Sequence, residues 1–511
     1  MPDFEAQSQN VTLSAFPIIR HPMKLRFMKL LIRPAQEVAI KSKPVRRQQM
    51  RHLRQNIRKL LARLDHDIRV DGSWDRVDVE VPDDRGLSGP VLDALQRIPG
   101  ISTIQEIGVF PFVDLEDVAE KAVQAFADRL NGRTFAVRAR RHGEHDFRSI
   151  DLERSVGAAL MQASSARGVN LREPDVEVRI EVRDEQFHIA HRKHRGTGGY
   201  PLGSVENVMT LVSGGYDSSV AAYLMLRRGL RSHYLFFNLG GVAHEVGVRQ
   251  VVHYLWDRYG ASHNARFISV PFEGVVAEIM RSVSHRHWGV ILKRQMLRAA
   301  AEIAKHNNVA GLVTGDAVAQ VSSQTLTNLN VVDRASDEVV MRPLIAMDKE
   351  SIIQIARDIG TEPFARTMPE YCGVISRKPA TRAKLYRVEA DEALMDPTVL
   401  AGAIEAREET PVDRLLESTV TPEDVELVQT PGVDDVIIDV RHPHEGEQSP
   451  LKLTSNEILQ IPFYELRQQL AALPDNRQYL LYCDRGTMSR LHAGHLRAEG
   501  RDNIKVYAPG A

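Results

Sequence analysis

Between Val208 and Gly360, short apolar runs alternate with segments of helical periodicity, and this alternation constrains the fold more than any other feature of the 511-residue chain. It is typical of a parallel sheet whose strands are joined by crossover helices. The carboxyl ends of parallel strands share one edge, where open α/β folds bind their ligands. We therefore predict a parallel sheet here. Its strands are expected at Val208–Val212, His233–Phe237, Arg266–Val270 and Gly311–Thr314.

The first of these strands runs into the loop Ser213-Gly-Gly-Tyr-Asp-Ser-Ser219 and then into the apolar helix Val220–Leu226. A strand, a glycine turn and a helix N-terminus present backbone N–H groups and the positive end of a helix dipole to an anion. Gly214 and Gly215 allow the backbone to approach phosphate closely. The Gly-Lys-Ser/Thr ending of a P-loop is missing. The segment instead resembles the PP-loop of enzymes that cleave ATP between its α and β phosphates; a glycine-rich turn without a ligand is the alternative.

Other polar residues are candidates for the same site. Thr314-Gly-Asp316 ends an apolar strand and should lie at the carboxyl edge of the sheet. Lys293 and Arg294 lie on a helical run and could neutralise polyphosphate, although isolated cations are more often surface residues. Gln320 and Gln324 could hydrogen-bond a nucleotide or its base.

The chain has only two cysteines, Cys372 and Cys483. Two cysteines cannot form a disulfide scaffold for a protein of this length, and no Cys-x-x-Cys is present to bind zinc or an iron–sulfur cluster. A lone cysteine is often a small buried hydrophobe. The other interpretation is a reactive thiol with a second thiol that resolves it.

Cys483 follows the apolar run Tyr479–Tyr482 and opens the loop Cys483–Met488. A tight loop whose N–H groups converge stabilises the negative charge of a thiolate or persulfide. Together with Asp439–Glu445, this loop resembles a rhodanese domain, which carries sulfur as a cysteine persulfide. A cysteine phosphatase would need arginine six positions after the cysteine, but that position is serine and Arg490 comes one residue later. A buried structural thiol is the third interpretation.

Basic residues are concentrated in the first 200 positions, although the net charge is only −1. Residues 24–63 contain thirteen Lys or Arg and one acid, and the apolar periodicity predicts an amphipathic helix over Val45–Leu64. Two smaller basic clusters lie at Arg138–His142 and His191–Arg195. A single cluster is usually a solvated face, but three together indicate a polyanionic partner. Few aromatic residues accompany them, so we expect recognition of a folded RNA by its shape and backbone.

The chain is predicted to be a multidomain α/β protein. A loose extension at 1–22 precedes two small α/β units with antiparallel sheets at 23–88 and 89–197, the parallel sheet domain at 198–385, an acidic linker at 386–430 and a last α/β unit at 431–511. No run of about 18 apolar residues is present, and the first 22 residues lack the apolar core of a secretory signal. We expect a cytoplasmic protein without membrane contact.

This order, read as a ferredoxin-like basic domain, a THUMP domain, a PP-loop domain and a C-terminal rhodanese domain, resembles the bacterial tRNA sulfurtransferases that make 4-thiouridine. The resemblance covers residues 23–509. It is carried by Leu211–Asp217, Phe237–Gly241, Val290–Lys293, Leu312–Asp316, Gln320–Gln324, Arg366–Ser376 and Leu481–Arg490.

The resemblance implies a set of site residues. ATP contacts are implied at Leu211, Val212, Lys293, Gly315 and Gln324, beside the loop residues Ser213, Gly214, Gly215, Asp217 and Ser218. Catalytic roles fall on Asp217, on Cys483 as persulfide carrier, and on Cys372 as its disulfide partner. Mg²⁺ is expected to accompany ATP, and no protein ligands to a metal are predicted. Contacts to tRNA are implied at Arg138, Arg140, Arg141, Lys193 and Arg195.

The implied reaction is ATP-dependent transfer of sulfur from the Cys483 persulfide to uridine 8 of tRNA. The implied partners are a cysteine desulfurase that loads the sulfur, a thiol reductant that reopens the disulfide, and the sulfur carrier protein that supplies the thiazole of thiamine. Two rival interpretations are a PP-loop ligase that uses an amine donor, and an RNA-binding chaperone with decayed catalytic domains.

Overall fold

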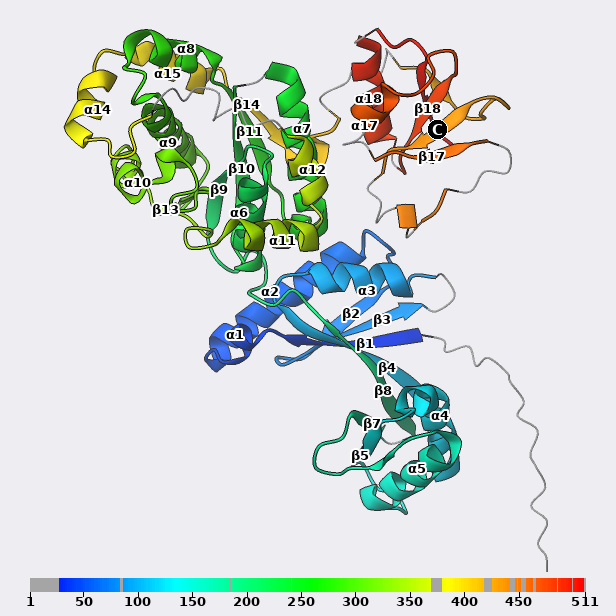
Figure 1. Cartoon of the computed structure of the whole chain (residues 1–511). Helices are drawn as coiled ribbons and strands as arrows, with labels where there is room; N and C mark the ends of the chain where they lie inside the picture. The colour runs from blue at the N-terminus through cyan, green and yellow to red at the C-terminus, as the bar shows by residue number, and fades with distance from the viewer. Residues whose placement is uncertain are drawn as a thin grey trace, which may run out of the picture. The chain divides into compact units, whose positions relative to one another are not determined.

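The computed structural model describes residues 27–82, 86–183, 185–239, 241–368, 379–417, 425–441, 446–447, 449–451, 456–462, 466–484, 486–498 and 500–509 (Figure 1). The chain forms two compact units. The described residues of 107–190 belong to the first unit, and those of 30–80, 87–106 and 191–509 belong to the second.

Eight strands of the N-terminal part form a single sheet in the order β2-β3-β1-β4-β8-β7-β5-β6. This differs from the two antiparallel sheets that the sequence predicted. β2 pairs with β3 and β7 with β8 in antiparallel fashion, but β5 runs parallel to β7 because α5 (Ser149–Ala163) crosses over between them. The strands are β1 (Phe27–Pro34), β2 (Arg69–Gly72), β3 (Val77–Pro82), β4 (Ile101–Pro111), β5 (Thr134–His142), β6 (Gly168–Val169), β7 (Val176–Arg183) and β8 (Gln186–Arg195).

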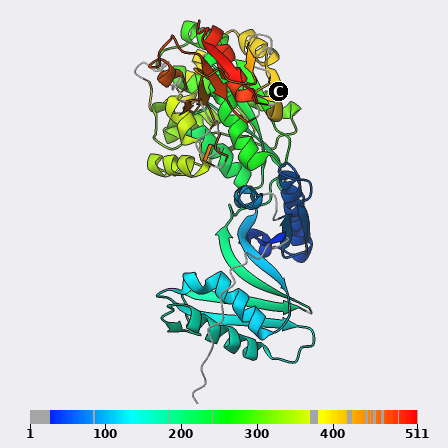
Figure 2. The same ribbon diagram turned by 90° about the vertical axis from the view of Figure 1, so that its right-hand side faces the viewer.

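The predicted amphipathic basic helix is present as α2 (Lys43–Leu61), drawn in dark blue in Figure 2. It follows the short helix α1 (Gln36–Ala39) and contacts α3 (Ser88–Arg97). Met50, Leu53 and Ile57 are fully or almost fully buried, so the apolar stripe faces the core. The basic residues are left on the remaining faces of α2.

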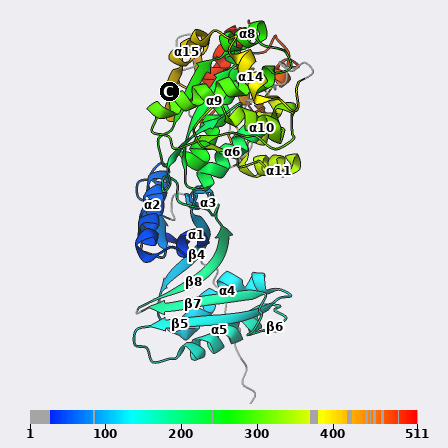
Figure 3. The same ribbon diagram turned by 90° about the vertical axis from the view of Figure 1, so that its left-hand side faces the viewer.

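In the first unit, α4 (Leu115–Phe126) and α5 lie side by side on one face of β5 and β7 (Figures 1 and 3). Asp114 caps α4 by accepting a hydrogen bond from the backbone N–H of Asp117 at 2.8 Å. A short 3₁₀ turn, Ala127–Leu130, ends this helix. The apolar side chains of both helices and of the strands form one core cluster.

The predicted parallel sheet of the second unit is confirmed. The strand order is β13-β12-β9-β10-β11-β14, and all pairs are parallel except the one between β11 and β14. β10 and β11 follow β9 on one side, whereas β12 and β13 lie on its other side. The strands are β9 (Asn207–Leu211), β10 (Arg231–Asn238), β11 (Arg266–Pro271), β12 (Leu312–Val313), β13 (Val340–Met341) and β14 (Glu408–Pro411).

Helices cover both faces of this sheet and form two separate core clusters (Figure 1). One face carries α6 (Tyr216–Arg227), α7 (Gly241–Leu255), which runs into a π-helical turn at Trp256–Gly260, and α11 (Lys349–Ile359), with α12 (Glu362–Thr367) following. The other face carries α8 (Glu273–Ser282), α9 (Trp288–His306) and α10 (Leu326–Asp333).

Much of the acidic segment predicted as a linker over 386–430 is packed into this domain. α14 (Leu385–Glu392) and α15 (Pro397–Glu405) contact α9, and β14 is an edge strand of the sheet. Its carboxylates have partners here, because Glu392 accepts hydrogen bonds from Arg294 at 2.8 and 2.9 Å and from Arg298 at 2.8 and 2.9 Å. The composition predicted a linker, because the arginines that pair with Glu392 lie 94 and 98 residues earlier in the sequence. The sequence alone does not show that such distant residues meet.

The C-terminal part is a five-stranded parallel sheet in the order β15-β19-β18-β16-β17, with α17 (Leu466–Leu470) and α18 (Thr487–Ala498). An α/β unit was predicted here, and its assignment as a rhodanese domain remains a prediction. The strands are β15 (Leu427–Val428), β16 (Val436–Asp439), β17 (Ile458–Gln460), β18 (Tyr479–Tyr482) and β19 (Ile504–Tyr507). In the described part of the chain, no helix is long and apolar enough to cross a membrane.

The ion pairs of Glu392 generate a stability prediction. Arg294 is 1% exposed, so Glu392→Gln would leave its guanidinium buried without a counter-charge. We expect a loss of about 3–5 kcal/mol in the free energy of unfolding. Urea titration followed by circular dichroism measures this, with Glu389→Gln on the exposed side of α14 as the control, expected within about 0.5 kcal/mol of the parent. Equal stability of both variants would contradict the prediction.

Candidate functional site

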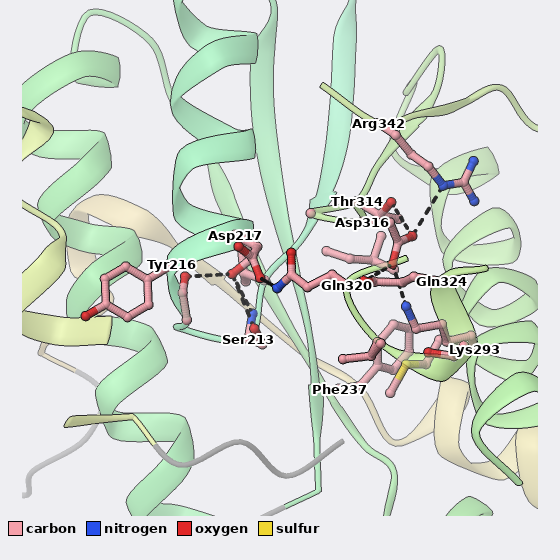
Figure 4. A pocket seen from close by; sticks show the side chains of 18 of the residues that line it. Ser213, Tyr216, Asp217, Phe237, Lys293, Thr314, Asp316, Gln320, Gln324 and Arg342 are labelled. Atoms are coloured by element: carbon pink, nitrogen blue, oxygen red, sulfur yellow. Dashed lines mark hydrogen bonds and ion pairs between the residues drawn. The ribbon is translucent and has the colours of Figure 1, made fainter. Parts of the chain in front are cut away.

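The chain adds β10 and β11 on one side of β9 and then places β12 on the other side of β9. The loops that follow β9 and β12 therefore diverge and leave a crevice between them. A cavity of about 360 Å³ lies there (Figure 4). This volume is in the range of sites for small ligands. All the residues predicted to contact ATP line the cavity except Gly214, which belongs to the loop beneath it.

The loop after β9 has the geometry expected of an anion site. Gly214 has φ +80°, which favours glycine, and Gly215 caps α6. The backbone N–H of Ser213 donates to Oγ of Ser218 at 3.1 Å. An added Cβ at Gly214 would lie 2.5 Å from Cε of Met368, so the loop packs directly against that thioether. The loop is therefore held from both sides before any ligand binds.

Gly315 is required by the close approach of two segments. An added Cβ at this position would lie 2.7 Å from the backbone carbon of Asp217 and 2.8 Å from the backbone N of Ser218. Glycine therefore allows the loop after β12 to touch the first turn of α6. This contact brings the two halves of the crevice together.

Asp316 is a buried carboxylate with several donors (Figure 4). Lys293 Nζ lies 2.5 Å away, Thr314 Oγ1 2.7 Å, Gln324 Nε2 3.0 Å and Arg342 Nε 3.3 Å. Burial by itself would raise the pKa of Asp316, but the charge and hydrogen bond of Lys293, the Thr314 hydroxyl and the charge of Arg342 hold this pKa well below its usual range. Asp316 therefore stays ionised and orients Lys293 and Gln324 toward the cavity.

Arg294 does not contribute to the site. The sequence suggested that it could neutralise polyphosphate beside Lys293. Its guanidinium is instead buried and bound to Glu392, and it also donates to the C=O of Val331 at 2.5 Å. Adjacent residues of a helix point about 100° apart, so Lys293 and Arg294 cannot both face the cavity.

Two residues that the sequence did not single out also line the cavity. Lys349, at the start of α11, donates to Oδ1 of Asp217 at 2.8 Å, while Gln320 donates to Oδ2 at 2.9 Å. Arg342, after β13, binds both Asp316 and Asp333. Arg342 lies just past β13 and Lys349 lies at the start of α11, at the same edge of the sheet. The sequence could not place them there, because β13 has only two residues and its pattern is too weak to predict.

His244 packs against the loop from α7. Its Nε2 lies 3.2 Å from the C=O of Ser213, and its ring meets that of Phe236 edge-on at 5.0 Å. Burial lowers the pKa of His244, although the contact with Ser213 opposes this. The imidazole is therefore a neutral packing group at neutral pH.

The cavity fits the nucleotide that the sequence predicted. Gln324 donates through Nε2 to Asp316, while its Oε1 is buried and has no hydrogen-bond partner among the described residues. A buried acceptor without a partner costs free energy that a ligand donor would recover. At the opposite side the glycine loop offers backbone N–H groups and a helix N-terminus to an anion. The acceptor on Gln324 thus matches a donor on the base of a nucleotide, and the glycine loop matches its phosphates.

Cys483 comes directly after β18 and is a free thiol, 8% exposed. The loop closes through a hydrogen bond from the N–H of Gly486 to the C=O of Cys483 at 3.1 Å, and Gly486 has φ +68°. Ser489, in the first turn of α18, donates its backbone N–H to Sγ at 3.3 Å, and its Oγ lies 3.5 Å from Sγ. A helix N-terminus thus faces the sulfur and stabilises negative charge on it.

The C-terminal sheet has a similar change of side, because β17 and β18 lie on opposite sides of β16. Cys483, which follows β18, therefore occupies the position in its sheet that the loop after β12 occupies in the other. Serine fills the position where a cysteine phosphatase needs arginine. Arg490 nevertheless faces this loop, since an added Cβ at Gly486 would lie 3.6 Å from its Nε, which is buried and without a partner in the part of the chain described.

A buried ion pair supports the same loop from β16. Arg441 binds both oxygens of Asp439 at 2.9 and 2.6 Å and reaches Asp484 at 2.7 Å. The hydrogen bond with Asp439 raises the pKa of Arg441, which stays charged. Burial, followed by the hydrogen bond to Asp484, raises the pKa of Tyr482 to about 12. Asp484, the residue after Cys483, is therefore held in place by Arg441 and Tyr482.

The remaining predicted site residues are Cys372 and five basic residues on β5 and β8. Cys372 lies outside the described residues, so its pairing with Cys483 stays a prediction. Arg138, Arg140 and Arg141 lie on β5, and Lys193 and Arg195 on β8. Four of these five side chains are exposed, while Arg138 is partly buried and donates to Glu177 and to the C=O of Leu171. Their role in binding RNA also stays a prediction.

Comparison with known families supports three of the domains. The family model "Thiamine biosynthesis protein (ThiI)" matches residues 203–396, the "THUMP domain" matches 112–192 and the "ThiI ferredoxin-like domain" matches 29–104. The ferredoxin-like, THUMP and PP-loop-type domains are thus confirmed. The matches to the first two models end at 104 and begin at 112, and α3 contacts α2.

Close relatives span nearly the whole chain. A tRNA sulfurtransferase of Marinobacter nauticus is 80% identical over 482 residues, which cover 94% of this chain and 100% of the relative. One of Pseudomonas syringae pv. tomato is 47% identical over 484 residues, with the same coverage. Among solved structures, a 4-thiouridine synthetase in complex with RNA and bound ATP matches with a TM-score of 0.66 and 26% identity, covering 75% of this chain and 99% of that one.

The contact at Gly315 generates a prediction for ATP binding. Gly315→Ala would push the first turn of α6 away from the loop after β12, so we expect ATP to bind at least about tenfold more weakly, a loss of about 1.4 kcal/mol. Isothermal titration calorimetry measures this. Gly402→Ala in α15 is the control, because nothing lies within 4 Å of an added Cβ there. Unchanged affinity of the Gly315 variant would show that the contact is dispensable.

Proposed function

This chain belongs to the tRNA sulfurtransferase family, and we propose that it uses ATP and a persulfide on Cys483 to convert uridine 8 of tRNA to 4-thiouridine. The observation that carries the proposal is that one chain holds two sites at strand switch points. One is a cavity suited to a nucleotide, and the other is a free thiol that faces a helix N-terminus.

ATP is the first substrate. The loop Ser213–Ser218 and the start of α6 would bind its phosphates, and Oε1 of Gln324 would accept a hydrogen bond from the base. Mg²⁺ usually reaches such sites on the phosphates of the nucleotide, with one or two carboxylates from the protein. Asp217 is the carboxylate at the loop. Lys349, which pairs with Asp217, and Lys293 would add positive charge where pyrophosphate departs.

In the first step, O4 of the uracil attacks the α phosphate of ATP, and the bond to the β phosphate breaks to release pyrophosphate. C4 thereby gains a good leaving group. In the second step, the terminal sulfur of the Cys483 persulfide attacks C4, and AMP leaves with the oxygen. Arg490 and the N–H of Ser489 would stabilise the negative charge of the persulfide before this attack.

The third step releases the product from the enzyme. The thiolate of Cys372 attacks Sγ of Cys483, a disulfide forms between the two residues, and the sulfur that leaves stays on C4 of the nucleoside with the electron pair. A thiol reductant then supplies two electrons to reopen the disulfide. A cysteine desulfurase restores the persulfide. The same persulfide would supply the sulfur carrier protein for the thiazole of thiamine, and we place these reactions in the cytoplasm.

Binding of tRNA is assigned to the basic N-terminal part. Arg138, Arg140 and Arg141 on β5 and Lys193 and Arg195 on β8 are our candidates for contacts with the phosphate backbone. The solved 4-thiouridine synthetase to which this chain is similar holds RNA and ATP in one complex, which supports a reaction that needs both. The rival PP-loop ligase would need an amine donor, and it gives no role to the thiol of Cys483.

The assignment of the sulfur carrier is tested by Cys483→Ala. We expect thiolation of unmodified tRNA to be abolished, because the variant lacks the sulfur that carries the persulfide, whereas tRNA affinity and pyrophosphate release stay at parental levels. Nucleoside analysis, filter binding and a pyrophosphate assay measure the three quantities. In the parent protein, incubation with desulfurase and cysteine should add the mass of one sulfur atom to the peptide with Cys483. Retained thiolation by the variant would refute this role.

A further inference from the structure

The basic side chains of α2 divide into two groups. Arg54 donates to the C=O of Gly72 at 2.6 Å, Arg58 to that of Val70 at 2.8 Å, Lys59 to that of Ser262 at 3.3 Å, and Arg63 just beyond the helix pairs with Asp257 at 2.5 Å. These cations are engaged in holding the fold. They explain part of the basic composition without any external partner.

A second group has no such partner. Lys43, Arg47 and Arg51 are exposed, and in the described residues none of them makes a hydrogen bond or an ion pair. Residues four apart lie on the same face of a helix, so the three form one stripe along α2. The helix contains seven Lys or Arg and no acid. We call Lys43, Arg47 and Arg51 the α2 stripe.

An aromatic side chain lies beside the first turn of this helix. Trp74 is at the tip of the β2–β3 hairpin and is 47% exposed, an unusual exposure for the largest apolar side chain. The guanidinium of Arg46, next to Arg47 in the helix, lies over the Trp74 ring at 4.1 Å from its centroid. One face of the indole is thus covered by a cation, so its exposed area lies on the opposite face and the edge.

The hairpin holds this indole in place. Gly72 has φ +144°, and an added Cβ there would collide with the C=O of Arg76, so only glycine fits the turn. Ser73 donates its N–H to the same C=O at 3.0 Å. Arg46 is itself fixed by a hydrogen bond from NH1 to the C=O of Ala39 at 3.1 Å. The indole and guanidinium therefore form a stack that is ordered before any partner binds.

The geometry points to a composite contact site for RNA, in which the α2 stripe binds the phosphate backbone and the open face of Trp74, which the sequence did not single out, stacks on an unpaired base. A pre-ordered aromatic ring next to unpaired cations is the combination with which proteins hold single-stranded nucleotides. Asp75 accepts a hydrogen bond from Ser73 at the hairpin tip, so negative charge adjoins Trp74 and favours a base over a phosphate there. This inference rests on the proposed tRNA substrate.

The two parts of the site are expected to behave differently with salt. Trp74→Ala should weaken tRNA binding about 5- to 150-fold, the range for loss of one stacked base, with an unchanged salt slope. Arg47→Gln and Arg51→Gln should each reduce the slope of log Kd against log salt by about one, because each removes one phosphate contact. Trp74→Phe should retain most of the affinity, since it keeps an aromatic face.

Matched controls are available in the second unit. Tyr386 is 61% exposed and Arg387 lies over its ring at 5.7 Å, so Tyr386→Ala removes a similar aromatic and arginine pair from an acidic helix. Lys305→Gln removes an exposed cation from the end of α9. Both controls should bind tRNA like the parent. Melting temperature and ATP affinity, measured for every variant, verify that each one is folded.

A direct measurement uses the fluorescence of Trp74. The chain has three tryptophans, and Trp256 and Trp288 donate their ring N–H groups to backbone C=O groups at 2.8 Å, so Trp74 is the exposed one. The difference in emission between parent and Trp74→Phe isolates its signal. Addition of tRNA should quench this signal and protect it from acrylamide.

The outcomes separate this inference from the proposed function. If the parent thiolates tRNA while Trp74→Ala matches it in Kd and in kcat/KM, the stacking site is refuted and the proposed function stands. If the parent neither binds nor thiolates tRNA, the proposed function itself fails. If Trp74→Ala weakens binding and alters the salt slope by as much as the arginine variants do, the separation into base and phosphate contacts is wrong.

Discussion

The direction in which the chain leaves β9 decides where chemistry can occur. β10 and β11 extend the sheet on one side, while β12 and β13 extend it on the other, so the loops after β9 and β12 must separate. Gly315 then lets these loops touch again at the first turn of α6. The result is a crevice with a helix N-terminus on one side and the buried carboxylate of Asp316 on the other.

Charge in this crevice is arranged in advance of binding. Asp316 is kept ionised by Lys293 and Arg342, and it fixes the orientation of Lys293 and Gln324 in return. Asp217 is similarly paired with Lys349. Groups that are already oriented need not reorganise when negative charge arrives or departs, which is the main way in which proteins stabilise phosphoryl transfer. In the C-terminal sheet, Ser489 and Arg490 provide the corresponding surroundings for Cys483.

Much of the lining of the cavity could be predicted because its signals are local. The loop Ser213–Ser219 lies within one strand–turn–helix segment, and its glycines have a conformational reason to be there. Lys349 and Arg342 could not be predicted, since they are single cations in a polar context that only the sheet brings to the site. For the same reason, the sequence left Arg294 open between a polyphosphate contact and a surface cation, whereas its guanidinium is buried. Its partner Glu392 is 98 positions away, and sequence distance carries no information on burial.

By itself, the sequence determined the alternation of strands and helices, the glycine loop, the cysteine loop and the excess of basic residues near the N-terminus. These depend on periodicity and on local backbone conformation, which neighbouring residues specify. Only the tertiary structure decided which basic side chains of α2 are used internally and which are available, and that Arg46 covers one face of Trp74. It also decided that the acidic segment contributes an edge strand to the sheet. Such contacts join residues distant in sequence, so they exist only once the chain has packed.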